Sequence, residues 1–187
     1  MCIRDRYIKA AESKGYKVLL LDSPIVPHLI QKLESKKENI SFARVDSDSI
    51  DNLIKKEDNI ISKLNDKEKD KLKNYIEAVI PKEKYTIQLE ALDSKELPFI
   101  ITQPEFMRRM KDMQQSGGNN MFGSMPEIHN VIINVNNDLV YTIFNSKSKV
   151  KRERLIKQSL DLARLSQNLL KGEELTSFIK RSFDIIK

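Results

Sequence analysis

The feature that most constrains the fold is a pair of consecutive amphipathic helices at residues 149–171 and 173–186, separated by Gly172. In the first helix, apolar residues spread over more than half of the circumference when they are placed at about 100° per residue. A helix on the surface of a monomer needs an apolar stripe of only about 100°. The extra width predicts that this helix is buried on two sides, against its own domain and against a partner.

The second helix carries a narrower stripe, so the pair predicts a helical hairpin with an apolar surface. Two hairpins related by a two-fold axis make a four-helix bundle, which predicts a homodimer. An intramolecular helix pair packed on a sheet fits the same pattern, and the pattern alone leaves both interpretations open. The residues predicted to face a second copy are Leu155, Leu162, Leu165, Leu169, Leu175, Phe178, Ile179, Phe183 and Ile186.

A domain boundary is predicted near residue 62, beside a charged stretch that is poor in apolar residues. Residues 7–62 predict a small α/β subdomain, in which strands at 17–21 and 40–45 flank a helix with Pro24 in its first turn. Strand, helix and strand form a crossover unit, and its two strands should lie parallel with a right-handed connection.

The first six residues, Met-Cys-Ile-Arg-Asp-Arg, resemble translated sequencing-adapter sequence more than native protein. They also lack the apolar core of a signal peptide. Residues 1–6 are therefore expected to be a non-native leader, and the chain is expected to be a fragment of a longer protein.

Residues 63–187 predict an α+β domain with a small sheet, which places the whole chain in the mixed α+β class. Strands at 85–89 and 98–102 flank a short turn and are expected to pair as a hairpin. A third strand is expected at 128–135 and a short helix at 138–145.

A methionine-rich segment follows the second of these strands. Its apolar residues share one face of a predicted helix at 105–115 and continue into a Gly-rich loop at 116–124. Methionine is flexible and polarizable, so an exposed face of this kind suits contacts with varied apolar partners, whereas a buried face would be ordinary core. Both interpretations stay open. The candidate contact residues are Phe106, Met107, Met110, Met113, Met121 and Phe122.

No residue pattern for catalysis, metal binding or cofactor binding stands out. The chain lacks a Gly-rich phosphate loop and a Gly-x-Ser-x-Gly nucleophile motif. Its two histidines, His28 and His129, have no further ligand at metal spacing. The longest apolar stretch, residues 18–21, is far shorter than a membrane helix. The single cysteine, Cys2, favours a reducing, cytoplasmic setting.

The formal net charge of +6 is mild, because 33 basic residues are interspersed with 27 acidic ones. Dedicated nucleic-acid-binding proteins concentrate their basic residues. The basic residues near Arg108 and Lys151 keep a nucleic-acid-binding module as the alternative function. No aromatic residue for base stacking lies within the basic run at 147–154, so nucleic acid is not expected as a partner. The lack of a long apolar stretch means that a membrane is not expected as a partner either.

Several segments, taken together, resemble the ninety-kilodalton heat-shock chaperones, in particular their bacterial branch. Residues 15–22, Gly-Tyr-Lys-Val-Leu-Leu-Leu-Asp, resemble the last part of that family's middle domain. Residues 98–111, a strand that leads into a Met-bearing helix, resemble its C-terminal domain. Residues 134–140 look like the family's Asn-Pro-Asp-His element, with Val-Asn-Asn in place of Pro-Asp-His. The two terminal helices match its dimerisation bundle.

The resemblance implies a molecular chaperone fragment that forms a homodimer and provides part of the surface for unfolded or partly folded client proteins. It also implies cooperation with the seventy-kilodalton heat-shock chaperone system. In this family ATP and Mg²⁺ bind in an N-terminal domain, so this fragment is expected to be no enzyme and to hold no cofactor. Client contacts are implied at Phe106, Met110 and Met113, and at a second patch with His28 and Gln31.

Overall fold

The computed structural model describes residues 3–23, 25–37, 39–45, 60–104, 106–107, 109 and 128–186. The chain divides into two units. Unit 1 comprises residues 1–56 and 102–127, and unit 2 comprises residues 57–101 and 128–187. The structure gives no test of the predicted boundary near residue 62, which stays a prediction.

Unit 1 contains the helices α1 (Ile3–Ser13) and α2 (Val26–Lys36). Gly15 ends α1, in the left-handed region at φ 82°. The Gly15 N–H donates to the Glu12 carbonyl and the Tyr16 N–H donates to the Ala11 carbonyl, which is the pattern of a Schellman cap. Helix α1 begins at Ile3, so it includes part of the predicted leader.

The two strands predicted beside α2 are not formed, and this part of the α/β prediction is wrong. Residues 17–21 and 40–44 have no strand assignment, and Leu19 and Leu20 are 70% and 79% exposed. A strand requires ladder hydrogen bonds to a neighbouring strand. At Phe42, side chains bind the backbone groups that a neighbouring strand would bind. The Phe42 N–H donates to the Glu34 carboxylate, and the Phe42 carbonyl accepts from Arg109.

Unit 2 is built on a three-stranded sheet of β1 (Tyr85–Glu90), β2 (Phe99–Thr102) and β3 (His129–Asn134), in the order β1-β3-β2. Strand β3 runs parallel to β1, in a register that pairs Tyr85 with His129. The predicted hairpin of the first two strands is therefore wrong. Strand β3 is buried on both faces, since Val131, Ile132 and Ile133 are all 0% exposed, and such a strand suits the centre of a sheet.

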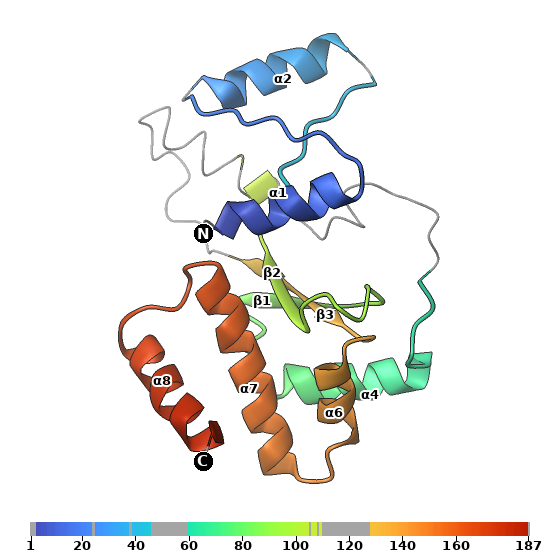
Figure 1. The fold of residues 1–187 in the computed structure, drawn as a ribbon, viewed down its shortest axis with the longest axis vertical. Coiled ribbons are helices and arrows are strands. Elements are labelled where there is room, and N and C mark those ends of the chain that lie inside the picture. Colours follow the sequence, from blue (N-terminus) through green and yellow to red (C-terminus); the bar gives the residue numbers. More distant parts are fainter. Residues whose placement is uncertain are drawn as a thin grey trace. The chain divides into compact units, whose positions relative to one another are not determined.

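The described residues of unit 2 also form the helices α4 (Asp66–Glu77), α6 (Asp138–Asn145), α7 (Lys149–Ser166) and α8 (Gly172–Ile186). Helices α4, α6 and α7 cover one face of the sheet, and α8 lies along the outer side of α7 (Figure 1). The main core contains Leu72 and Ile76 of α4, Val131 and Ile133 of β3, Val140 and Ile143 of α6, and Ile156, Leu160 and Ala163 of α7. The mixed α+β class is thus confirmed.

Helix α7 ends five residues earlier than predicted, at Ser166 instead of residue 171. Asn168 has a left-handed φ of 58°. Its N–H donates to the Leu165 carbonyl at 3.1 Å, and the Leu169 N–H donates to the Arg164 carbonyl at 2.9 Å. This is a Schellman cap with asparagine in the position that glycine usually takes.

Candidate interaction surfaces

Helix α7 is apolar on two sides, as its sequence predicts. One side packs on the sheet through Ile156, Leu160 and Ala163, which are all buried. The other side presents Leu162 and Leu165, which are 50% and 39% exposed. The helix therefore has an apolar face that nothing in the described part of this chain covers fully.

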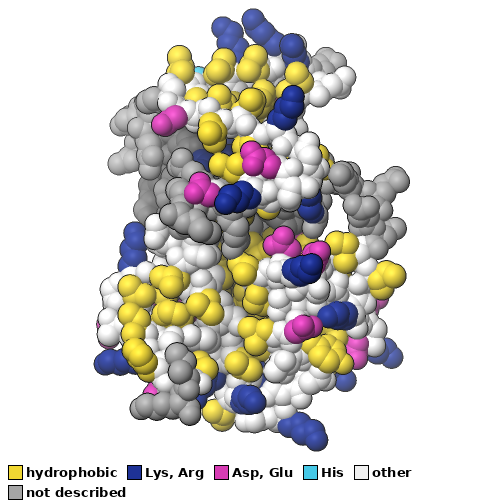
Figure 2. Space-filling view, in the orientation of Figure 1, with side chains coloured by type: hydrophobic (Ala, Val, Ile, Leu, Met, Phe, Trp, Pro, Cys, Tyr) yellow, Lys and Arg dark blue, Asp and Glu magenta, His cyan; other side chains and the backbone are white. Residues whose placement is uncertain are grey.

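Helix α8 also presents exposed apolar side chains. Ile179 and Phe183 are 46% and 64% exposed, one helical turn apart. We call Leu162, Leu165, Ile179 and Phe183 the hairpin patch. Figure 2 shows hydrophobic side chains gathered over the α7–α8 hairpin, at the lower left of the view.

The remaining residues predicted to face a second copy lie elsewhere. Leu155 and Leu169 pack against the main core, Phe178 is buried, and Leu175 is half-buried. The side chain of Ile186 lies outside the described residues, and the neighbouring Ile185 is 41% exposed. The sequence stripe did not point to Ile185.

In unit 1, a groove of about 660 Å³ brings the two predicted client patches together. Phe106 lines it and is 70% exposed. His28 and Gln31 of α2 also line it and are exposed. Apolar residues of the extended segment 17–22 complete the wall. Met107 is half-buried. The candidates Met110, Met113, Met121 and Phe122 lie outside the described residues.

Arg109 connects two walls of this groove. Its guanidinium donates two hydrogen bonds to the Glu34 carboxylate, at 2.8 and 3.2 Å, and one to the Phe42 carbonyl at 2.6 Å. The bonds from Arg109 and from the Phe42 N–H lower the pKa of Glu34 below its ordinary value of 4.5. Glu34 is therefore a carboxylate at neutral pH, and it holds Arg109 at the groove that Phe106 also lines.

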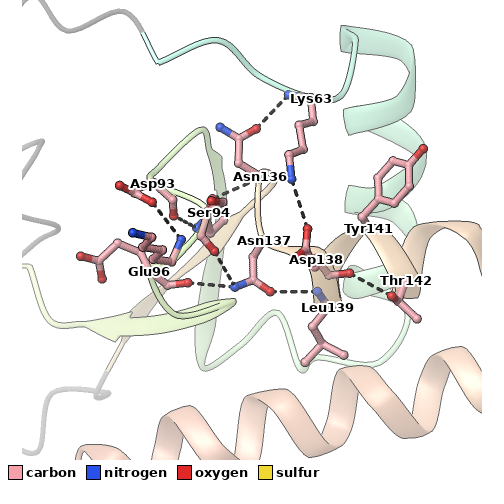
Figure 3. A network of polar contacts seen from close by, with 12 residues as sticks. Lys63, Asp93, Ser94, Glu96, Asn136, Asn137, Asp138, Leu139, Tyr141 and Thr142 are labelled. Carbon is pink, nitrogen blue, oxygen red and sulfur yellow. Dashed lines mark hydrogen bonds and ion pairs between the residues drawn. The ribbon is translucent and has the colours of Figure 1, made fainter.

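The segment that resembles the family's Asn-Pro-Asp-His element forms a polar corner (Figure 3). The Asn136 side chain accepts from the Lys63 N–H at 2.8 Å and donates to the carbonyls of Ile61 and Leu92, both at 3.1 Å. The Asn137 side chain caps α6 by accepting from the Leu139 N–H. Asn136 is 5% exposed, so this corner joins the segment before α4 to the sheet.

Part of the basic run is already used within the fold. The Arg152 guanidinium lies 3.8 Å from the centre of the Tyr75 ring and donates to the Ser146 carbonyl at 3.0 Å. Arg108 lies outside the described residues. Arg152 thus stabilises the contact of α7 with α4, which leaves less of the run for an anionic partner.

Among the described residues there is no group of three or more His, Cys, Asp or Glu side chains that would hold a metal ion. None of the described helices is both long enough and apolar enough to cross a membrane.

No protein-family model matches the chain. The chain is 36% identical over 163 residues to a protein named Chaperone protein HtpG from Porphyromonas gingivalis, in an alignment that covers 85% of this chain and 24% of that protein. It is 30% identical over 248 residues to the protein of that name from Bacteroides thetaiotaomicron, with 96% of this chain and 36% of that protein covered. The chain thus spans about a quarter to a third of the length of these curated relatives.

Proposed function

The chain is a homologue of the HtpG chaperones, matching part of their length, and from this premise we propose that it provides self-association and part of the client-binding surface of a bacterial chaperone. The single observation that carries the proposal is the hairpin patch. Soluble monomers rarely expose a large contiguous apolar patch. An apolar face on a helical hairpin is self-complementary when two copies meet on a two-fold axis.

The proposed dimer is a four-helix bundle of two α7–α8 hairpins. Each copy buries the hairpin patch against the same patch of the other, while Ile156, Leu160 and Ala163 stay in the core of their own domain. This arrangement gives both apolar sides of α7 a partner, which is why we prefer it to a purely intramolecular helix pair.

Client binding is the second part of the proposal, and the unit 1 groove supports it. A concave apolar surface with a few polar groups suits exposed apolar segments of partly folded proteins. Phe106 is the most exposed aromatic side chain at this groove and would make the main contact. We place ATP and Mg²⁺ binding outside this chain, and we extend the proposal to a cytoplasmic protein that cooperates with the seventy-kilodalton heat-shock chaperone system.

Sedimentation equilibrium tests self-association. The wild-type chain should sediment as a dimer at micromolar concentrations, and Leu162→Glu with Phe183→Glu should give a monomer, because burying two unpaired carboxylates is strongly unfavourable. Val150→Glu is the matched control, since Val150 is an apolar α7 residue that is 75% exposed outside the patch. A wild-type chain that stays monomeric at every concentration would contradict the proposal.

Fluorescence anisotropy with labelled, reduced α-lactalbumin, a permanently unfolded protein, tests client binding. Phe106→Ser should weaken binding severalfold, because the main apolar contact is lost. Tyr141→Ser is the control, since Tyr141 is a 48% exposed aromatic residue on α6 of unit 2 and is not a lining residue of the groove. Equal affinities of both variants and the wild type would remove the groove from the client-binding surface.

A further inference from the structure

A buried acidic residue lies between α7 and α8. Asp161 is 5% exposed and accepts hydrogen bonds from Arg164, one turn further along α7, and from Arg181 of α8. Both guanidinium groups are themselves mostly buried, at 15% and 16% side-chain exposure. Asp161 is thus the centre of an ionic contact between the two helices.

A second set of hydrogen bonds also joins α7 to α8. The Arg181 Nε donates to the Gln158 Oε1 at 2.9 Å. The Gln158 Nε2 donates to the Ser182 Oγ at 2.7 Å, and this hydroxyl donates to the Phe178 carbonyl within α8. One side chain of α8, Arg181, is therefore held by two side chains of α7.

Arg164 extends the contact to the start of α8. Its guanidinium pairs with Glu174 and donates to the Leu169 carbonyl in the connecting turn. The bond from Arg164 lowers the pKa of Glu174. We call these residues the interhelical network: Gln158, Asp161, Arg164, Glu174, Arg181 and Ser182.

Apolar packing alone leaves the angle of α8 poorly defined. Phe178 is the only described apolar residue of α8 that is fully buried. A single buried ring allows a helix to tilt and rotate about it, whereas hydrogen bonds at several points do not. Buried ion pairs contribute little net stability compared with apolar packing, and in some proteins they select one geometry over its alternatives. Arg164 Nε is buried without a hydrogen-bond partner, which further limits what the network adds to stability.

The network joins the same two helices that carry the hairpin patch. Around α8, Arg181 lies about 200° from Ile179 and from Phe183, so the contacts of Arg181 with α7 fix the direction in which these two apolar side chains face. A rotation of α8 by one residue, about 100°, would change the direction in which Ile179 and Phe183 face by the same angle. The shape of the patch therefore depends on the angle that the network sets.

We infer that Asp161 and Arg181 are positioning residues for self-association, which hold α8 at the angle that makes one continuous apolar face for a second copy of this chain. The inference rests on the proposed dimer. It adds that the face is prepared before the second copy binds, so that loss of the network weakens the dimer even though every residue of the patch is retained.

Arg181→Met is the first test, because it removes the α8 cation and leaves Asp161 paired with Arg164. Sedimentation should show a dimer dissociation constant raised on the order of tenfold or more, since one partner of a buried ion pair is lost. Glu153→Gln is the matched control, because Glu153 forms an exposed ion pair with Lys149 on the same helix at 3.8 Å. Asp161→Glu, which keeps the charge, should retain most of the dimer.

The helix angle is measured directly with nitroxide labels at Lys157→Cys and Lys180→Cys, after Cys2, the only cysteine, is replaced by serine. Arg181→Met should broaden the distance distribution between the labels. The thermal unfolding of the sheet core should stay close to that of the wild type. This combination separates a change of helix angle from general unfolding.

The outcomes distinguish this inference from the proposed function. A wild-type dimer with an unchanged dissociation constant, or an unchanged label distance, in Arg181→Met overturns the inference and leaves the proposed dimer standing. A wild-type monomer at every concentration overturns both. Should Arg181→Met fail to fold, the Ser182→Ala variant removes the hydroxyl contacts with Gln158 and with the Phe178 carbonyl. Equal dimer affinity together with an unchanged label distance in that variant overturns the inference.

Discussion

At the scale of single residues, side chains take over backbone hydrogen bonds at the point where the sequence favours a strand. Glu34 and Arg109 bind the N–H and the carbonyl of Phe42 respectively. The local pattern of residues 40–45 predicts a strand, but it cannot predict that residues distant in the sequence will occupy its backbone groups. This is why the helix α2 was predicted and the strand beside it was predicted wrongly.

Replacement of Arg109 by Gln should raise the pKa of Glu34 toward its ordinary value of 4.5, because the hydrogen bonds from Arg109 are the largest cause of the lowered pKa. The folded-state pKa lies below the unfolded one. The Glu34 contact therefore stabilises unit 1 fully above about pH 4.5, and this stabilisation is lost as the pH falls through the folded pKa. An NMR titration of the Glu34 side chain measures both pKa values. The same pKa in the variant and the wild type would contradict the assignment.

Substitution of Asn136 should instead affect the segment before α4. In Asn136→Ala the Lys63 N–H and the carbonyls of Ile61 and Leu92 lose their side-chain partner. We expect a loss of about 2 kcal/mol or more in the free energy of unfolding, since a buried polar group left unsatisfied costs about 1–3 kcal/mol. Trypsin should also cleave faster after Lys63. Asn74→Ala, at an exposed position on α4, is the control and should change neither measurement.

The sequence located this corner only through the resemblance of residues 134–140 to a family element. It gave no sign that Asn136 would bind the segment around Lys63, which lies 73 positions away. The hairpin patch is easier to predict from the sequence, because the width of the apolar stripe on α7 predicts two buried sides. It did not separate Phe178 from Ile179, since neighbouring residues lie in one stripe and only the closure of the hairpin decides which of them faces α7.

At the scale of elements, the end of α7 shows how a single residue sets the length of a helix. Asn168 adopts φ 58° and terminates α7, where the sequence suggested that Gly172 would do so. Asparagine is the non-glycine residue that adopts this conformation most readily, so it is a weaker sequence signal than glycine. The pairing of the strands is harder to predict from the sequence than the helix ends. Strand β3 lies between two strands that precede it in the sequence by about thirty residues or more, and no local pattern encodes this insertion.

Substitution of Asn168 tests this cap. Asn168→Ala should lower the free energy of unfolding by about 1 kcal/mol, because a Cβ without a compensating polar group is strained in the left-handed region. Asn168→Gly should be neutral or slightly stabilising for the same reason. Urea denaturation of the two variants gives the difference. A variant with Ala as stable as the variant with Gly would mean that residue 168 changes conformation when it is substituted.

At the scale of the whole molecule, the two units differ in how much apolar surface their described residues bury. Unit 2 has a continuous core that joins α4, α6 and α7 to the sheet. In unit 1 the described apolar residues that are fully buried are Tyr7 and Ala11. Stability follows buried apolar area, so the two units should open with different free energies.

Hydrogen exchange followed by mass spectrometry measures this difference. Amides of β3 should exchange slowest, and amides of α1 and α2 should exchange faster by at least one order of magnitude, because opening free energies range from near zero up to the global value within one protein. Ile133→Ala removes a fully buried core side chain and should destabilise unit 2 by about 2–5 kcal/mol. Exchange in α2 should stay unchanged in that variant if the two units open separately. A parallel increase of exchange in α2 and β3 would show instead that the units unfold as one, and the low burial in the described part of unit 1 would then be offset by contacts elsewhere.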